Sequence, residues 1–378
     1  MHTALPHFTA VAPRTALRYA LSPLVLSICL ASASGCAPRS ASEPWSTKAQ
    51  STTSRTPPPS APAAGSPRPN QTSPANAALS SRADAVIREA AASPDPSTRA
   101  HAIEGSIRQP SLLQELAPKA LVDQNRGVRF VACMAVGEAR LSEFTHLVQP
   151  LLTDDSASVR AAAILTLTRL GVTVDPTPLG AMAASDDLEA RANAYLVLGL
   201  LGNRSAVPII RSSLGNATPL ANPIRVRLVD LQGAEALVRL GETREIDSIR
   251  AAVFSPPEQE ELAVVACESL GRLHDEVSAP MLRNILAPNA GRARAPEVRL
   301  AAASALLSLG APSKPILTIA REYVGDADPR VRAQAAVLLG KLASASSTEF
   351  LNALRVDSDP TVRLCASAAS LSPAETGE

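Results

Sequence analysis

Apolar residues recur along most of the chain with the spacing of one helical face, and the pattern itself is repeated. Between Asp326 and Leu342, the apolar residues Val331, Ala335 and Leu339 stand one position before, three after and seven after Arg332. These offsets fall on one side of a helix with 3.6 residues per turn. The small alanine in the middle allows a neighbouring helix to approach closely. The stretch therefore predicts a helix that is buried along one face.

The same arrangement returns about every 30 to 40 residues, so the position of Arg332 defines an equivalent slot in each copy. The slots are occupied by Arg99, Arg129, Arg160, Arg191, Asp230, Ala263, Arg299, Arg332 and Arg363. A second apolar-periodic segment precedes each slot helix, as in residues 279–286 and 314–324. Two helices per copy at this period are typical of a helical solenoid. We predict an all-α fold, a right-handed α-solenoid of about nine helical hairpins over residues 80–372.

The ends of the predicted helices carry capping residues. An aspartate followed by proline recurs at Asp95, Asp328 and Asp359. The carboxylate can accept hydrogen bonds from the first free N–H groups of a helix, and proline at the first position loses no hydrogen bond. Glycine is expected to end six of the helices in the left-handed conformation. These glycines are Gly171, Gly202, Gly241, Gly271, Gly310 and Gly340.

The consensus D-x-D-P-x-V-R-x-x-A-A-x-x-L-G resembles the HEAT-like repeat of the phycocyanobilin lyase type, with its best copies at residues 154–171, 326–340 and 357–369. The resemblance extends over most of the chain. It implies that the slot arginine pairs with an aspartate of a neighbouring unit, forming a structural ladder. The ladder residues are Arg99, Arg129, Arg160, Arg191, Arg299, Arg332 and Arg363. The fifth and sixth copies depart from the consensus at Asp230 and Ala263, and Arg227 is an alternative slot residue for the fifth.

Residues 1–36 lack the repeat and have the features of an export signal. Arg14 and Arg18 form a positive region before a mostly apolar run over residues 19–33, and no acidic residue appears before Glu43. Residues 33–36 resemble a bacterial lipoprotein box in which Cys36 is acylated, which predicts a membrane anchor at the cell envelope. Residues 31–33 also fit an ordinary signal peptidase site, which predicts a secreted protein. An organellar transit peptide fits less well, because the apolar run is continuous.

Residues 37–79 are rich in serine, proline, threonine and alanine, with scarcely any large apolar side chain. Such a segment cannot bury enough surface to offset the loss of chain entropy, so we predict a disordered linker. A flexible chain of this length would hold the solenoid about 35 Å from its anchor. Residues 373–378 form a short tail.

Composition and motifs give little reason to expect an active site. A net charge of +1 and only 2% aromatic residues argue against a nucleic-acid partner. His101, His146 and His274 are isolated, so no metal site and no cofactor are expected. No catalytic residue is predicted, because nucleophile and phosphate-loop motifs are absent. Cys133 and Cys267 are interpreted as buried apolar residues. Cys365 stands at a more outward offset in the last unit, which leaves an exposed thiol as the alternative to a structural residue.

One surface feature stands out from the repeat. In HEAT repeats the second helix lines the concave surface, and positions two, five and nine after the slot are expected to face it. Three successive copies place apolar residues there, and these are Val131, Met134, Ala162, Leu165, Leu196 and Leu200. An exposed apolar stripe favours docking of a partner protein or peptide, although tight curvature or the folded-back linker would bury it. We therefore predict a non-enzymatic interaction scaffold; the alternative is an enzyme, most nearly a bilin lyase.

Overall fold

The computed structural model describes residues 74–216, 221–287 and 294–371, and their side chains from residue 81 onwards. Within these ranges the chain forms α-helices and short 3-10 helices, with no strand. The predicted signal peptide, Cys36, most of the predicted linker and the tail lie outside the described residues.

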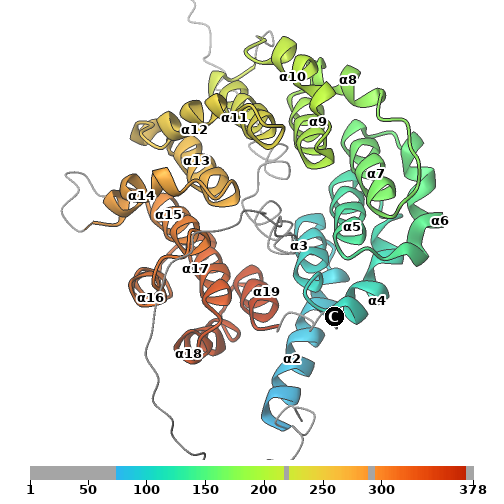
Figure 1. The fold of residues 1–378 in the computed structure, drawn as a ribbon. Helices are drawn as coiled ribbons and strands as arrows, with labels where there is room; N and C mark the ends of the chain where they lie inside the picture. Colours follow the sequence, from blue (N-terminus) through green and yellow to red (C-terminus); the bar gives the residue numbers. More distant parts are fainter. Residues whose placement is uncertain (1–73, 217–220, 288–293, 372–378) are drawn as a thin grey trace, which may run out of the picture.

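The helices pair into nine hairpins along the described chain, which confirms the predicted all-α solenoid (Figure 1). The first helices of the hairpins lie on the outside: α2 (Pro74–Ala91), α4 (Pro110–Ala120), α6 (Thr145–Val148), α8 (Pro178–Ala183), α10 (Val207–Ser213), α12 (Ile246–Ala252), α14 (Ala279–Leu286), α16 (Ser313–Glu322) and α18 (Ala345–Leu354). The second helices lie inside: α3 (Pro96–Ser106), α5 (Arg126–Glu138), α7 (Ala157–Arg169), α9 (Leu188–Leu201), α11 (Pro223–Arg239), α13 (Glu260–Arg272), α15 (Pro296–Ser308), α17 (Pro329–Leu342) and α19 (Pro360–Ala369).

Short 3-10 helices lead into or extend several outer helices, and one precedes α13. They are η1 (Ser142–Phe144), η2 (Gln149–Thr153), η3 (Arg204–Ala206), η4 (Thr243–Glu245), η5 (Pro257–Gln259) and η6 (Glu276–Ser278). The first hairpin is longer than predicted, because α2 begins at Pro74 rather than at residue 80. Residues 74–79 therefore belong to a helix and not to the linker.

The aspartate caps form as the sequence predicts. The carboxylate of Asp95 accepts a hydrogen bond from the Thr98 N–H, and Asp328 accepts one from the Arg330 N–H. In the last unit Asp359 accepts from two backbone N–H groups. In each case a proline occupies the start of the helix, where its missing N–H costs no intrahelical bond.

Two of the predicted terminating glycines have a different role. Gly171, Gly202, Gly241 and Gly310 take the left-handed conformation, with φ between 70° and 95°. The other two, Gly271 and Gly340, lie inside α13 and α17. A Cβ added at Gly340 would lie 2.6 Å from the Ala369 Cβ, so this glycine permits close helix packing.

The solenoid closes on itself into a ring, because the last inner helix returns to the first hairpin (Figure 1). Helix α19 packs against both α2 and α3. An apolar cluster fills this junction, with Leu364 and Leu371 from the last unit against Ile87 and Leu112 from the first two. The described residues therefore form a closed circle of repeats rather than an open arc.

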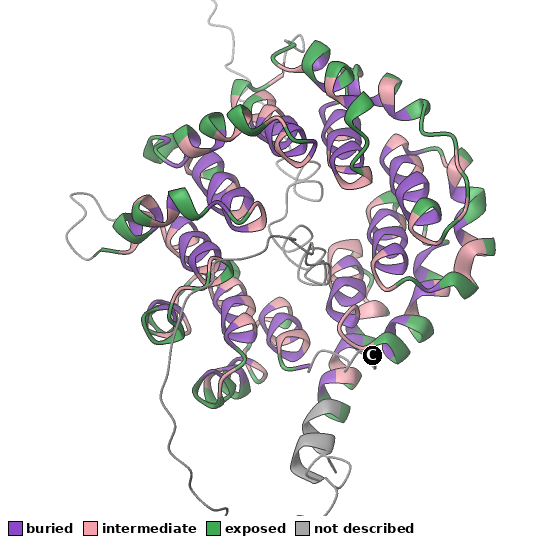
Figure 2. Cartoon of the chain, in the orientation of Figure 1, coloured by how far each residue is buried: buried purple, intermediate pink, exposed green. Residues whose placement is uncertain are grey.

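The remaining core consists of two apolar clusters that meet at α11. One extends from α3 to α11 and the other from α11 to α19. Buried residues concentrate on the inner helices, and exposed residues on the outer helices and loops (Figure 2). Within the described residues, none of the helices combines the length and the apolar character needed to cross a membrane.

Candidate binding surface on the inner face of the ring

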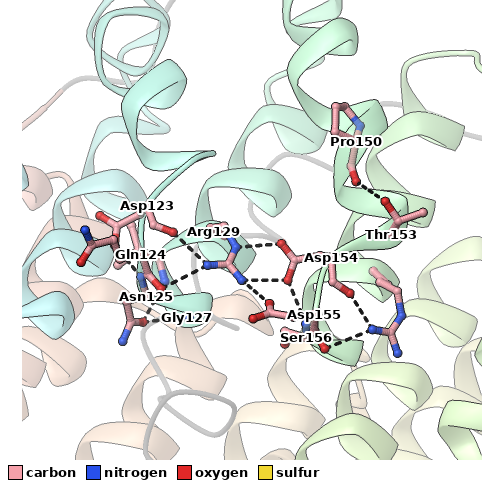
Figure 3. Close-up of polar contacts among 12 residues, drawn as sticks. Asp123, Gln124, Asn125, Gly127, Arg129, Pro150, Thr153, Asp154, Asp155 and Ser156 are labelled. Atoms are coloured by element: carbon pink, nitrogen blue, oxygen red, sulfur yellow. Dashed lines mark hydrogen bonds and ion pairs between the residues drawn. The ribbon is translucent and has the colours of Figure 1, made fainter.

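The slot arginine and an aspartate of the next unit form a repeated ion pair at the loop ends of the inner helices (Figure 3). Arg129 donates from Nε and Nη2 to the two carboxylate oxygens of Asp154, both at 2.8 Å. It also donates to the backbone carbonyl of Asp123, at 2.9 Å. Arg99 with Asp123 and Arg332 with Asp357 repeat this two-pronged geometry at 2.8 Å.

The paired aspartates also organise the loop that follows them. Asp154 accepts a hydrogen bond from the Ser156 N–H, and Asp357 accepts one from the Asp359 N–H. Burial alone would raise the pKa of Asp154, but the bonds from Arg129 and the backbone hold that pKa below its usual range. Each arginine–aspartate pair is one rung of the ladder. It connects an inner helix to the loop before the next inner helix, which is a structural role.

The ladder is not continuous around the ring. Arg160 and Arg363 donate, within the described structure, to backbone carbonyls of their own loops. The position that would supply their aspartate partner holds Ser185 and Ser93. Buried Arg191 donates to the Ser185 and Asn216 carbonyls, and Arg299 donates to Glu322 at 2.7 Å.

In the sixth unit, whose slot residue is Ala263, an arginine of the outer helix forms a separate ion pair with the loop after α13. Arg250 of α12 forms a two-pronged pair with Asp275, at 2.6 and 2.9 Å. The fifth slot residue, Asp230, accepts a hydrogen bond from the Gly215 N–H, and Arg227 donates to Gln259. Where the fifth and sixth copies depart from the consensus, the slot residue therefore does not form an arginine–aspartate pair.

The predicted apolar stripe is not an open surface. Val131, Met134 and Leu165 are 4, 3 and 1% exposed and belong to the core cluster that extends from α3 to α11. The expectation that they are exposed is wrong. The inner helices converge as the solenoid curves into a ring, which buries side chains that face the concave side. Leu196 and Leu200 on α9 remain partly exposed.

A group of charged side chains lies beside this apolar region, on α11 and α13. The carboxylate of Glu235 accepts hydrogen bonds from Arg272 at 2.9 and 2.7 Å, from Arg239 at 2.7 Å and from the Ser269 hydroxyl at 2.5 Å. Burial raises the pKa of Glu235, but Arg272 and the other donors outweigh burial and hold it well below its usual range. Glu235 is thus a fixed, ionised group.

The charged group continues from Arg272 to α15 and α17. Glu268 lies 3.7 Å from Arg272, and burial raises its pKa to about 7 against the opposing effect of nearby cations. Lys341 donates to the Ser304 hydroxyl at 2.8 Å. Burial lowers the pKa of Lys341, and the opposing effect of the Glu268 charge does not outweigh it.

A second acidic group is buried on α3. Glu104 is 2% exposed, and neither of its carboxylate oxygens has a hydrogen-bond partner among the described residues. Burial raises its pKa to about 8. Glu104 is therefore mostly protonated at neutral pH and adds little negative charge to the inner face.

A shallow hollow marks the place where the apolar and charged regions meet, between α9 and α11. Its lining residues are Leu196, Gln232, Glu235, Ala236 and Arg239. The sequence pattern identified Leu196 as a partner-binding residue. Gln232, Glu235 and Arg239 occupy the same offsets of two, five and nine residues, counted from the fifth slot. It did not show that Glu235 joins the arginines of two helices, because that contact depends on how α11 packs against α13.

The described residues contain no group of three histidine, cysteine or acidic side chains that could hold a metal ion. Cys133, Cys267 and Cys365 are free and buried, and burial raises the pKa of each thiol to about 12. The alternative of an exposed thiol at Cys365 is wrong. It is buried because α19 is covered by the first hairpin when the ring closes.

Comparison with known proteins agrees with this architecture. A family model described as HEAT repeats matches residues 83–168 and 292–372. Among solved structures, the chain is similar to the CpcE–CpcF complex of phycocyanin lyase from Nostoc sp. PCC7120, with 20% identity and a TM-score of 0.36, over 68% of this chain and 94% of that one. It is also similar to human deoxyhypusine hydroxylase in complex with glycerol, with 15% identity and a TM-score of 0.33, over 78% of this chain and 96% of that one. No curated protein matches the chain. The two matched segments contain HEAT repeats, and the stacked helical hairpins continue between them around the ring.

Proposed function

We propose that this protein is a non-enzymatic scaffold that binds a segment of a partner protein on the inner face of its ring. The observation that carries the proposal is the hollow between α9 and α11, where Leu196 meets Gln232, Glu235 and Arg239. Binding sites commonly combine an apolar lining with a few fixed polar groups that orient the ligand. This surface offers both to one partner segment.

The polar groups at the hollow are held in place before any partner arrives. Glu235 accepts bonds from three side chains on two helices, so its carboxylate has little freedom to move. Arg239 is fixed in turn by its bond to Glu235. Groups that are ordered in advance reduce the entropy lost on binding. The ring therefore supports recognition through shape and fixed polar contacts.

Site-specific photocrosslinking in intact cells tests this proposal. A benzophenone amino acid replaces Leu200, which is partly exposed beside the hollow, and in a matched variant it replaces Val356, which is 81% exposed on an outer loop. We expect one discrete protein adduct from position 200 and not from position 356. A folded Leu200 variant that yields no adduct, or the same adducts as the Val356 variant, would overturn the proposal.

We further propose that the protein is exported and anchored at the cell envelope through lipid on Cys36. The apolar run, the absence of early acidic residues and the lipoprotein-like box at residues 33–36 support this localisation. Intact-mass analysis of the mature protein, with and without an inhibitor of lipoprotein processing, tests it. An acylated N-terminus at Cys36 is the expected result. Cleavage after Ala33 without lipid would indicate a secreted protein instead.

A further inference from the structure

One contact in the ring joins units that are not consecutive in the sequence, namely that of α19 with the first hairpin, α2 and α3 (Figure 1). We call this contact the closing joint. The two main apolar clusters end at α3 and at α19, and a separate cluster of seven buried residues fills the joint between them. The apolar contacts that close the ring are therefore distinct from those that hold the units together within each half.

Helix packing at the closing joint differs in register from packing inside the solenoid. In four internal contacts, a glycine eight residues after one slot lies against the residue six after the next slot. These contacts join Gly137 to Thr166, Gly199 to Ala236, Gly271 to Ala305 and Gly340 to Ala369. At the closing joint the residue six after the slot is Gly105, and it meets Ala368, which stands five after its own slot. The preceding helix thus contributes a position about one helical turn earlier.

The arginine–aspartate ladder is also interrupted at the closing joint. Arg363 of α19 donates to the backbone carbonyls of its own loop, both at 2.9 Å. The first unit has Ser93 at the position from which Asp123 and Asp154 accept bonds from a preceding slot arginine. The joint after Arg160 lacks its rung as well, so the missing rung alone does not distinguish the closing joint.

Buried polar groups without partners flank the tight contact at the closing joint. Glu104 stands directly before Gly105, and neither of its carboxylate oxygens has a hydrogen-bond partner among the described residues. Ser367 stands directly before Ala368 and is fully buried, and its hydroxyl also lacks a partner there.

An internal joint handles its buried hydroxyl differently. Thr166, which lies against Gly137, donates from Oγ1 to the backbone carbonyl of Cys133 at 2.7 Å. Leaving a carboxyl or a hydroxyl buried without a partner is costly, whereas separation of the helices would return it to water. The closing joint therefore carries a polar cost that this internal joint avoids.

We propose that the ring opens at the closing joint, between α19 and the first hairpin, while the internal joints stay packed. The open form is a minor state of the free protein, in which water reaches the Glu104 carboxyl and the Ser367 hydroxyl. In this form the inner face can be reached from the side, so opening controls access to that face. The opening is a property of the ring itself and does not depend on the proposed partner.

Single-molecule Förster transfer in the full-length mature protein tests this proposal. Dyes on Val122→Cys and Val356→Cys report across the closing joint, and dyes on Phe254→Cys and Val356→Cys report within one half of the ring. All three positions are exposed, and the native cysteines are buried. We expect a minor low-transfer population for the first pair and a single population for the second. A single population for both pairs, or a low-transfer population for both, would overturn the proposal.

Two substitutions should shift the population toward the closed form. Ser367→Ala and Glu104→Met each remove a buried group without a partner, so each should reduce the low-transfer population about fivefold or more. Ser255→Ala is the matched control, because the Ser255 hydroxyl is also buried without a partner but lies in the loop after α12. It should leave the population unchanged.

Equal effects of Ser255→Ala and Ser367→Ala would show that the orphaned groups do not act at the closing joint, and the proposal would fall. Circular dichroism of each variant ensures that a changed population does not reflect a loss of fold. Ser367→Ala keeps the test decisive should Glu104→Met fail to fold.

Discussion

Gly105 of α3 and Ala368 of α19 meet where the first and last units join, and a Cβ added at Gly105 would lie 2.8 Å from the Ala368 Cβ. This distance is too short for two side chains, so the ring closes only because one of the two residues has none. The junction between the ends of the repeat is therefore as closely packed as the junctions within it, such as that between Gly340 and Ala369.

Replacing Gly105 by leucine should separate the first and last units. The added side chain overlaps Ala368, and overpacking of this kind typically costs about 1–3 kcal/mol. We expect a lower melting temperature and a larger radius of gyration in small-angle X-ray scattering. Gly325→Leu is the control, because nothing lies within 4 Å of a Cβ at that position. An unchanged scattering curve for the Gly105 variant would show that closure does not depend on this contact.

Replacing Arg332 by glutamine should remove a complete rung of the ladder. The variant leaves Asp357 without its two-pronged partner, and the side chains of both residues are largely shielded from solvent. A loss of about 2–3 kcal/mol in urea unfolding is expected, since bonds to charged groups exceed ordinary hydrogen bonds. Arg330→Gln, whose side chain is mostly exposed, should cost less than about 1 kcal/mol. Equal costs at the two positions would contradict a structural role for the ladder.

The stability of the protein should fall as pH rises from about 4.5 to about 8 through the effect of Glu104. Burial raises its pKa from 4.5 to about 8 in the folded state, so over this range the folded protein retains a proton that the unfolded chain has released. Glutamine in its place stays neutral. The difference in unfolding free energy, Glu104→Gln minus wild type, should therefore be larger at pH 9 than at pH 5 by on the order of 3–5 kcal/mol. Urea unfolding at the two pH values measures this difference, and a constant offset between the proteins would refute the assignment.

Replacing Glu235 by glutamine should destabilise the junction between α11 and α13 at neutral pH. The buried guanidinium of Arg272 would lose its main carboxylate partner, and breaking a buried pair from one side costs about 3–5 kcal/mol. The stability provided by Glu235 should be present above the usual glutamate pKa and be lost as pH falls, because its folded pKa is depressed. Thermal unfolding at pH 7 and pH 3 should therefore show a large difference between wild type and variant at pH 7 and a smaller one at pH 3.

The three cysteines of the ring should be unreactive in the folded protein. Cys133, Cys267 and Cys365 are buried, and their thiol pKa values are raised to about 12, so little thiolate is present at neutral pH. Iodoacetamide labelling followed by peptide mass spectrometry should modify none of them until urea unfolds the protein. Rapid labelling of Cys365 alone would indicate that α19 separates from the first hairpin in solution.

The repeat and its helices could be predicted from sequence because they depend on local spacing and capping. The packing supports Asp230 as the slot residue of the fifth unit. Ala236, six residues after Asp230, lies against Gly199 of the preceding inner helix. In the seventh unit, Ala305 stands six residues after Arg299 and lies against Gly271 in the same way. The burial of Met134 and Leu165 could not be predicted in the same way. It depends on the curvature of the whole solenoid, which is the sum of small rotations between units.

The contacts of individual residues could also be predicted only where they follow from the repeat pattern. The pairing of Arg129 with Asp154 follows a consensus that repeats at a fixed offset, and the resemblance to HEAT-like repeats was enough to expect it. The terminating role predicted for Gly271 and Gly340 is wrong, because a glycine near a helix end has the same sequence signature whether it ends the helix or permits a neighbouring helix to approach. Only the distance to the adjacent helix distinguishes the two.

An array of repeats that closes into a ring has no terminal units. In an open array the outermost units have one neighbour each, and they fray first on heating. Here the first described hairpin packs on the last, so each unit within the described ranges has two neighbours. If one interface between two units opens, each of the two units is still held by its other neighbour. Separation requires two breaks at once, and the boundary at α11, where the two halves of the core meet, is a natural place for the second.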